Sequence, residues 1–186
     1  MFVSRLVPAL TVDGVVHLKD LIRDIPDFPN PGIVFKDITP LLADADAFRC
    51  MADALVGHFA DRPVDKVVGI EARGFILAAP IAYLMGAGFV PVRKAGKLPW
   101  RTRVEEYSLE YGTDRLEMHQ DGVEEGDNVL VVDDVLATGG TAAATLRLVE
   151  AAGGRVVGVG FVIELAFLGG RSRLAEHESV ALLTYE

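Results

Sequence analysis

Residues 129–141 read VLVVDDVLATGGT, the stretch that says most about the fold. The apolar run 129–132 is typical of a strand buried on both faces of a sheet. Two adjacent carboxylates, Asp133 and Asp134, follow this run. A Thr-Gly-Gly-Thr turn at 138–141 then leads into a segment of helical length. The pattern predicts a buried strand, an acidic pair and a helix N-terminus in direct succession.

This turn has the composition of a phosphate-binding loop. Amides at a helix N-terminus carry free N–H groups and partial positive charge, and glycines let the backbone approach an anion closely. The loop is not a P-loop, because the lysine of G-x-x-x-x-G-K-[ST] is missing, and the chain has no G-x-G-x-x-G fingerprint. The candidate phosphate-binding residues are Ala137, Thr138, Gly139, Gly140 and Thr141.

The acidic pair suggests a sugar next to that phosphate. Side by side, Asp133 and Asp134 could accept hydrogen bonds from two vicinal hydroxyl groups. The ligand suggested by the residues is therefore a ribose 5-phosphate. The alternative is a capped core helix after a buried strand, with two solvated acids between them.

Outward from this stretch, short apolar runs alternate with segments of helical length. We expect strands at 66–70, 89–92, 128–132, 155–163 and 180–183, and helices at 44–60, 75–85, 140–152 and about 168–176. Strands that alternate with helices predict an α/β fold with a mostly parallel central sheet flanked by helices. Residues 104–111 and 115–119 break the rhythm and flank Gly-Thr-Asp at 112–114, which predicts a β-hairpin.

Length and composition exclude several classes of protein. The chain has 186 residues, which fits a single domain, and 51% hydrophobic with 24% charged residues excludes a disordered tail. The net charge of −9 argues against general binding to nucleic acid or to an anionic membrane. Cys50 is the one cysteine and cannot form an internal disulfide, so a cytoplasmic location is expected.

Two stretches were considered as membrane segments. The apolar part of residues 1–12 is interrupted by Arg5 and is too short to span a bilayer, so we interpret 1–16 as an N-terminal extension. Residues 74–92 lack charge, but their glycines and prolines divide them into a buried helix and a strand. No membrane association is therefore expected.

Motifs across the chain resemble the type I phosphoribosyltransferases, and the adenine phosphoribosyltransferases in particular. The acidic pair with its Thr-Gly-Gly-Thr loop resembles the signature of the larger group. The resemblance runs from about residue 18 to residue 186, in order. The supporting segments are FPNPGIVF (28–35), EARGF (71–75), RKAGKLP (93–99), YSLEYG (107–112) and EL (164–165).

This resemblance implies a fold and an activity. The expected fold is the type I phosphoribosyltransferase fold in residues 17–186, with a small hood at about 17–40 and a flexible loop at about 93–119. The expected reaction is purine salvage, in which adenine and 5-phosphoribosyl 1-pyrophosphate (PRPP) give AMP and pyrophosphate. The resemblance implies Mg²⁺ bound through PRPP, with no direct protein ligand, and a homodimer.

The resemblance also assigns roles to residues. Asp133 and Asp134 would hold the ribose hydroxyls, and 137–141 the 5-phosphate. Pyrophosphate would lie on the backbone of the loop at Ala72 and Arg73, which often contains a cis non-proline peptide bond in this family. Without the resemblance, the same residues would be interpreted as an ordinary strand-to-helix turn. Five basic residues fall within 93–103 of this acidic chain, which indicates a polyanion nearby or a solvated loop. The implied pyrophosphate-binding residues are Ala72, Arg73, Arg93, Lys94 and Lys97.

A glutamate at the expected hairpin tip is the candidate catalytic residue. By resemblance, Glu110 would lie near N7 and N9 of the purine and exchange a proton with the base. Without the surrounding YSLEYG segment, a turn glutamate would be interpreted as merely solvated.

The base is expected to bind near the 28–36 segment. An adenine needs an apolar slot with an aromatic face, an acceptor for its N6 amine and a donor for N1, which backbone groups can provide. The resemblance points to Val34, Phe35, Lys36 and Leu165, although Phe35 and Leu165 alone would be interpreted as core residues.

Two alternative functions follow from the same resemblance. One is phosphoribosyl transfer to hypoxanthine, guanine, xanthine or orotate. The other is a non-catalytic regulator that binds PRPP and DNA, but such a regulator would need a winged-helix domain and a basic face, neither of which the sequence indicates.

Overall fold

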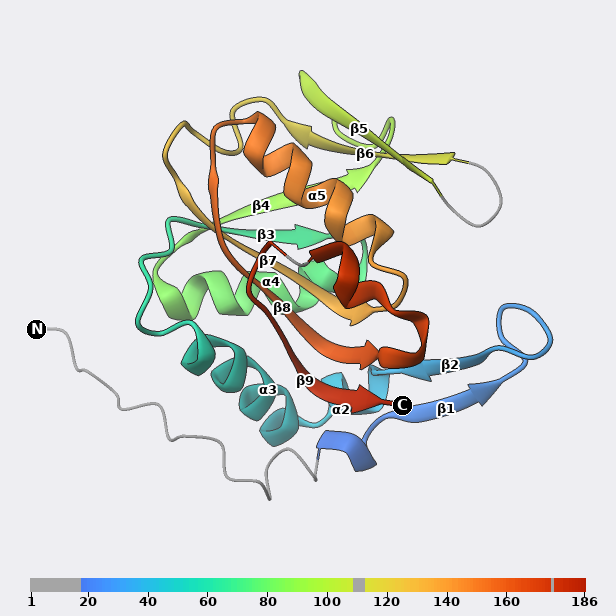
Figure 1. Ribbon diagram of the computed structural model, residues 1–186. Coiled ribbons are helices and arrows are strands. Elements are labelled where there is room, and N and C mark those ends of the chain that lie inside the picture. Colours follow the sequence, from blue (N-terminus) through green and yellow to red (C-terminus); the bar gives the residue numbers. More distant parts are fainter. Residues whose placement is uncertain (1–17, 109–112, 175) are drawn as a thin grey trace, which may run out of the picture.

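The computed structural model describes residues 18–108, 113–174 and 176–186, and within these residues seven strands form one sheet in the order β5-β6-β4-β3-β7-β8-β9 (Figure 1). Five strands run parallel to one another, namely β4, β3, β7, β8 and β9. Strands β5 and β6 add an antiparallel hairpin at the β4 edge. The strands are β3 (Lys66–Ile70), β4 (Gly88–Lys94), β5 (Thr102–Ser108), β6 (Thr113–His119), β7 (Asn128–Leu136), β8 (Arg155–Leu165) and β9 (Ser179–Tyr185).

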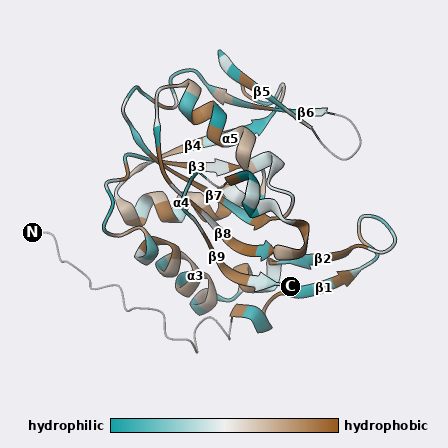
Figure 2. Ribbon diagram, viewed as in Figure 1, coloured by the Kyte–Doolittle hydropathy of each residue, from teal (hydrophilic) through white to brown (hydrophobic). Residues whose placement is uncertain are grey.

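Side chains along the central strands point alternately to the two faces of the sheet, so each face has its own hydrophobic core. Leu130 and Val132 of β7 face one side, where they pack with α3 (Ala45–His58) and α4 (Arg73–Met85). Val129 and Val131 face the other side, which α5 (Gly140–Ala151) covers. Because both faces are covered, the central strands are mostly apolar apart from polar residues toward their ends, as Figure 2 shows. The predicted α/β architecture is confirmed.

Smaller elements complete the fold. A separate two-stranded antiparallel sheet pairs β1 (Arg23–Pro26) with β2 (Val34–Asp37), and the short helix α2 (Thr39–Ala43) follows it. This sheet lies within the region expected to form the hood. Among the helices of the described residues, none has the length and apolar character needed to cross a membrane.

The predicted elements recur with small shifts, and two details differ. Strand β7 continues through Leu136, so the acidic pair lies inside the strand, where Asp133 still pairs with Phe161 of β8. The helix expected at 168–176 is wrong. Its residues form two short 3₁₀ turns, Ala166–Leu168 and Gly170–Leu174, because Gly169 has the left-handed φ of +65° that ends a helix. The tip of the hairpin lies outside the described residues.

Candidate functional site

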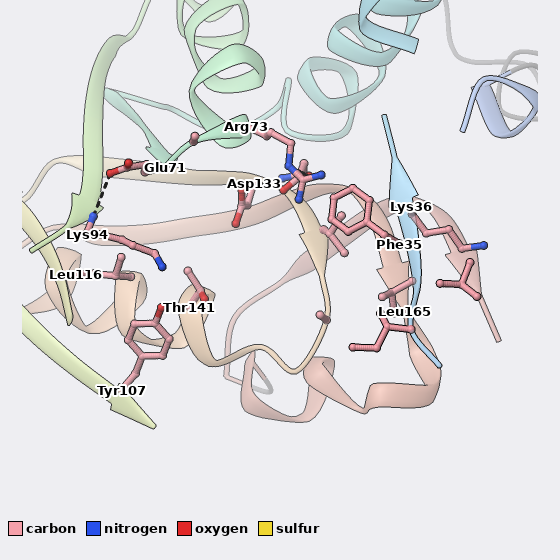
Figure 3. Close-up of a pocket in the computed structure, with 16 residues that line it drawn as sticks. Phe35, Lys36, Glu71, Arg73, Lys94, Tyr107, Leu116, Asp133, Thr141 and Leu165 are labelled. Atoms are coloured by element: carbon pink, nitrogen blue, oxygen red, sulfur yellow. Dashed lines mark hydrogen bonds and ion pairs between the residues drawn. The ribbon is translucent and has the colours of Figure 1, made fainter. Parts of the chain in front are cut away.

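A cavity of about 390 Å³ opens at the carboxyl ends of β3 and β7 (Figure 3). In α/β sheets, ligands bind outside this edge of the strands. The cavity brings together residues from β2 to β8 that are far apart in sequence. The predicted site residues that line it are Val34, Phe35, Lys36, Ala72, Arg73, Lys94, Asp133, Asp134, Ala137, Thr141 and Leu165.

Asp133 lies near the middle of this cavity (Figure 3), and its neighbour Asp134 also lines it. Asp133 Oδ1 accepts a hydrogen bond of 2.9 Å from the Asp134 backbone N–H. Burial and the neighbouring charge of Asp134 raise the pKa of Asp133 well above its usual range. Burial also raises the pKa of Asp134, although the charge of Arg73 opposes this rise. The charged forms of the two carboxylates at this cavity are therefore destabilised by burial, and a hydrogen-bond donor or a positive charge would stabilise them.

Arg73, at the start of α4, contacts both the acidic pair and the aromatic wall. Its Nε lies 2.8 Å from Asp134 Oδ2, and its guanidinium carbon lies 4.8 Å from the centre of the Phe35 ring. The Arg73 contact is an ion pair without hydrogen-bond alignment, since Asp134 Oδ2 is buried and has no hydrogen-bond partner among the described residues. Such a buried acceptor is costly unless a ligand donates to it.

The predicted phosphate loop borders a second cavity of about 70 Å³. This cavity shares Asp133, Val135, Ala137 and Thr141 with the larger one, and its lining also includes Thr138, Gly139 and Gly140. Gly139 has a φ of +76° and precedes α5, so the first-turn amides of a 12-residue helix lie at the cavity. The loop is placed as the sequence predicts, at a helix N-terminus beside the acidic pair.

The apolar end of the larger cavity contains Phe35 and Leu165 (Figure 3). Phe28 packs edge-on against Phe35, with ring centres 5.3 Å apart. The side chain of Lys36 is engaged elsewhere, since its Nζ lies 2.6 Å from Asp24 Oδ1 and 4.1 Å from the centre of the Tyr185 ring. Strand β2 therefore offers the cavity the Phe35 ring and backbone groups, rather than a lysine charge.

The opposite end of the cavity is polar and contains Lys94, Tyr107 and Glu71 (Figure 3). Lys94 Nζ lies 3.1 Å from Asp114 Oδ2, and this hydrogen bond raises the pKa of the lysine. Tyr107 is buried and donates a hydrogen bond of 3.3 Å to the same carboxylate oxygen. Lys94 stays charged here and has an exposed side chain that an anion can reach.

Two predicted pyrophosphate-binding residues, Arg93 and Lys97, do not line the cavity. Both pair with Glu71, which accepts from Arg93 Nε at 3.1 Å, from the Lys94 backbone N–H at 3.2 Å and from Lys97 Nζ. Burial alone would raise the pKa of Glu71, but these hydrogen bonds lower it. The peptide bond between Glu71 and Ala72 is cis.

The structure adds residues that the sequence did not assign to the site, and one prediction is outside its reach. Glu71 and Tyr107 stand in segments already quoted for the family resemblance, whereas Leu116 and Val135 carry no signal beyond strand alternation. Glu110 lies outside the described residues. The cavity-lining residues that the sequence missed are Ile33, Glu71, Tyr107, Leu116 and Val135.

Within 18–108, 113–174 and 176–186, no group of three or more histidine, cysteine, aspartate or glutamate side chains is placed to hold a metal ion. Asp133 and Asp134 are adjacent carboxylates in the lining of the cavity. Mg²⁺ commonly binds through one or two carboxylates together with substrate phosphates and waters. The acidic pair therefore fits a magnesium ion that arrives with a phosphorylated ligand.

Comparison with known proteins gives a consistent picture. Residues 36–180 match the phosphoribosyl transferase domain family. The adenine phosphoribosyltransferase of Acidothermus cellulolyticus is 65% identical over 153 residues, which are 82% of this chain and 86% of the relative. The crystal structure of the enzyme from Rhodothermus marinus has a TM-score of 0.91 and 55% identity, and covers 94% of this chain and 100% of its own.

A third relative was solved with bound ligands. The adenine phosphoribosyltransferase of Saccharomyces cerevisiae, in complex with an imino-altritol bisphosphate and adenine, has a TM-score of 0.88 and 40% identity, and covers 93% of this chain and 100% of its own. Similarity of this extent, over nearly the whole of both chains, shows that this chain belongs to the adenine phosphoribosyltransferases.

Proposed function

We propose that the protein transfers the phosphoribosyl group of PRPP to N9 of adenine. The bond between C1′ and pyrophosphate breaks, the bond between C1′ and N9 forms, and N9 loses its proton. The products are AMP and pyrophosphate, so the reaction recovers free adenine in purine salvage. The observation that carries this proposal is the buried Asp134 Oδ2 beside a glycine-rich helix N-terminus, an oxygen that is ion-paired with Arg73 but accepts no hydrogen bond from the described residues.

The middle of the cavity would hold the ribose 5-phosphate part of the substrate. A ribose hydroxyl that donates to Asp134 Oδ2 supplies the hydrogen bond that this buried acceptor lacks, and Asp133 would accept from the neighbouring hydroxyl. The 5-phosphate would lie on the first-turn amides of α5. The residues proposed for this phosphate are Ala137, Thr138, Gly139, Gly140 and Thr141.

Adenine would occupy the apolar end of the cavity. Phe35 offers an aromatic face and Leu165 an apolar one. Backbone groups at Val34 and Lys36 can form hydrogen bonds with the N6 amine and N1 of the base. The orientation of the Lys36 side chain supports this assignment, because its charge points to Asp24 and away from a neutral base.

Pyrophosphate would lie toward the opposite end, near Ala72, Arg73 and Lys94. Lys94 can neutralise its charge directly, because this lysine lines the cavity and stays protonated. The transition state of this reaction is expected to resemble an oxocarbenium ion, so positioning and electrostatics carry most of the catalysis. Glu110 is proposed to exchange the N9 or N7 proton with the base. To bind pyrophosphate as predicted, Arg93 and Lys97 would have to break their ion pairs with Glu71 or contact the pyrophosphate of a neighbouring subunit.

We also propose that Mg²⁺ accompanies PRPP. The ion would be bound mainly by substrate oxygens, with Asp133 and Asp134 as its nearest protein carboxylates. When bound, it neutralises charge that develops on the leaving pyrophosphate. A PRPP titration with and without the metal checks this, and equal affinities in both would contradict it.

A homodimer is the proposed assembly. The outer face of α4 exposes large apolar side chains at helical spacing, including Ile76 and Tyr83, and Phe89 of β4 continues this surface. Strand β4 then leads into Arg93 and Lys94. A second copy packed on this face would cover the apolar surface and bring the basic segment of one subunit near the other.

The proposed location is the cytoplasm. Cys50 is a free, half-buried thiol, which suits a reducing compartment. Cell fractionation would test this, and recovery of the protein from an oxidising compartment would contradict it.

A panel of bases tests the proposed activity. The protein is incubated with PRPP, Mg²⁺ and each of adenine, hypoxanthine, guanine, xanthine and orotate, and nucleotide formation is followed. We expect the highest kcat/KM with adenine. Asp134→Asn should lose most of the activity, whereas Glu178→Gln, which alters a surface ion pair with Arg62, should retain it. An equal or higher kcat/KM with another base would overturn the proposal.

A further inference from the structure

Glu164 belongs to a segment that resembles the family, yet the proposed reaction gives it no role. Its side chain is buried, with 7% of the residue exposed. Both of its oxygens pair with Arg171, which donates from Nε to Oε1 at 2.9 Å and from the second amino group to Oε2. The remaining amino group of Arg171 donates to the backbone oxygen and hydroxyl of Ser179, at 2.8 and 2.9 Å. This arginine ties the segment after β8 to both β8 and β9.

The residue before Arg171 presses against the proposed phosphate loop. Gly170 is buried, and a Cβ placed on it would lie 2.1 Å from the Ala137 carbonyl oxygen and 2.8 Å from the Gly139 nitrogen. A Cβ on Gly139 would in turn lie 2.4 Å from the Gly170 carbonyl oxygen. The two backbones therefore approach each other so closely that neither position can hold a side chain without movement.

The strand register places Glu164 next to residues at both ends of the proposed site. Glu164 pairs with Leu136, the residue just before the phosphate loop, and is followed by Leu165 of the base-binding end. A bidentate arginine–carboxylate pair fixes distance and orientation together. The pair therefore sets the position of Gly170 relative to both the phosphate loop and the apolar wall.

We propose that Glu164, Arg171 and Gly170 are positioning residues that hold the phosphate loop at a fixed distance from the base-binding end. None of the three lines either cavity, so each acts through the backbone of 137–139. Fixed geometry of this kind matters because a shift of about 1 Å in a binding group can cost about 100-fold in rate. The inference rests on the proposed function, since it assigns 137–141 to the 5-phosphate.

Gly170→Ala tests the inference, and the neighbouring Gly169→Ala is its matched control. Gly169 has a φ of +65° and nothing within 4 Å of its Cβ position, so alanine there adds conformational strain without a collision. Gly170→Ala adds the same methyl group against the phosphate loop. We expect Gly170→Ala to raise the KM for PRPP and the Kd of ribose 5-phosphate at least about tenfold, with the KM for adenine changed less than about threefold. Gly169→Ala should leave both values within about twofold, whatever its effect on Tm.

Arg171→Lys provides a second measurement if Gly170→Ala does not fold. A lysine keeps the charge but loses the bidentate geometry, so the ribose 5-phosphate Kd should rise about three- to tenfold while the pyrophosphate Kd stays within about twofold. A ribose 5-phosphate Kd within about twofold of the natural protein in the folded variant overturns the inference, as does an equal rise in Gly169→Ala. Failure of the natural protein to form AMP would instead contradict the proposed function.

Discussion

Burial makes the charged forms of Asp133 and Asp134 unfavourable for folding, and the proposed binding role of this pair would have the same physical cause. Burial and mutual repulsion raise the pKa of Asp133, so its ionised form is less stable in the folded chain than in the unfolded chain. A ligand that donates hydrogen bonds offsets that cost, which is the usual trade between stability and function at a binding site.

Asp133→Asn should therefore stabilise the ligand-free protein at pH 7. The raised pKa means that the penalty of Asp133 develops as the pH rises from about 4 through that pKa, so the two proteins should be equally stable below about pH 4. The affinity for PRPP should fall about 10- to 150-fold, as expected for a lost hydrogen bond of about 1.5–3 kcal/mol to a charged acceptor. Denaturant unfolding across pH and calorimetry measure both. Exposed Asp121→Asn is the control, and a variant less stable than the natural protein at every pH would contradict the argument.

Glu110→Gln should lower the chemical step by about 100- to 10,000-fold, the usual range for general acid–base assistance. The affinity for adenine should change far less, because the contribution is specific to the transition state. Single-turnover measurement with pre-bound PRPP is required, since product release could limit kcat and hide the effect. A loss below about threefold would show that Glu110 does not transfer the proton.

The basic segment at 93–103 forms ion pairs that the sequence did not predict. Its cluster of cations predicts an anion nearby, and Lys94 does reach the cavity. Arg93 and Lys97 instead pair with Glu71, more than twenty residues earlier in the chain. Charge density is a property of sequence, but the partner of each charge depends on which strands become neighbours, so these ion pairs could not be predicted.

Elements were predictable where local chemistry decides them. Strand β3 has the predicted bounds, because its apolar run stops abruptly at polar neighbours. The Asp44 side chain caps α3, accepting from the backbone N–H groups of Asp46 and Ala47 at 3.1 and 2.9 Å. The helix expected at 168–176 is wrong because Gly169 and Gly170 stand near its start, where Gly169 has a left-handed φ and the close approach of Gly170 to residues 137–139 depends on tertiary structure.

Asp44→Ala should destabilise the protein by about 1 kcal/mol, the typical cost of losing a helix N-cap, since two amides of α3 lose their acceptor. The helix lies on the sheet face away from α5, so kcat/KM at a temperature well below Tm should stay within about twofold. Denaturant unfolding gives the free-energy change. Asp46→Ala removes an exposed carboxylate from the same turn and should cost less. A larger loss for Asp46→Ala than for Asp44→Ala would contradict the capping assignment.

At the scale of the whole molecule, the site depends on strand order. Alternating strands and helices predict a parallel sheet, but the order β4-β3-β7-β8 determines that Ala72, Asp133 and Leu165 share one edge. Sequence patterns alone do not fix that order, so the family resemblance supplied what the physical reading could not. The apolar outer face of α4 was likewise interpreted as part of a buried helix, although Tyr83 is 86% exposed in the single chain.

That exposure leads to a prediction about assembly. The protein should have a solution mass near twice the 20.0 kDa of one chain, because a second copy would bury the apolar α4 face. The double variant Ile76→Glu and Tyr83→Glu places charges on that face and should shift the mass toward one chain, as measured by light scattering at micromolar concentration. Its KM for PRPP should rise more than its KM for adenine if the partner's basic segment assists pyrophosphate binding. Phe167→Glu, which alters an exposed apolar residue beyond β8, is the control and should remain dimeric. A monomeric natural protein, or a double variant that stays dimeric, would rule out this interface.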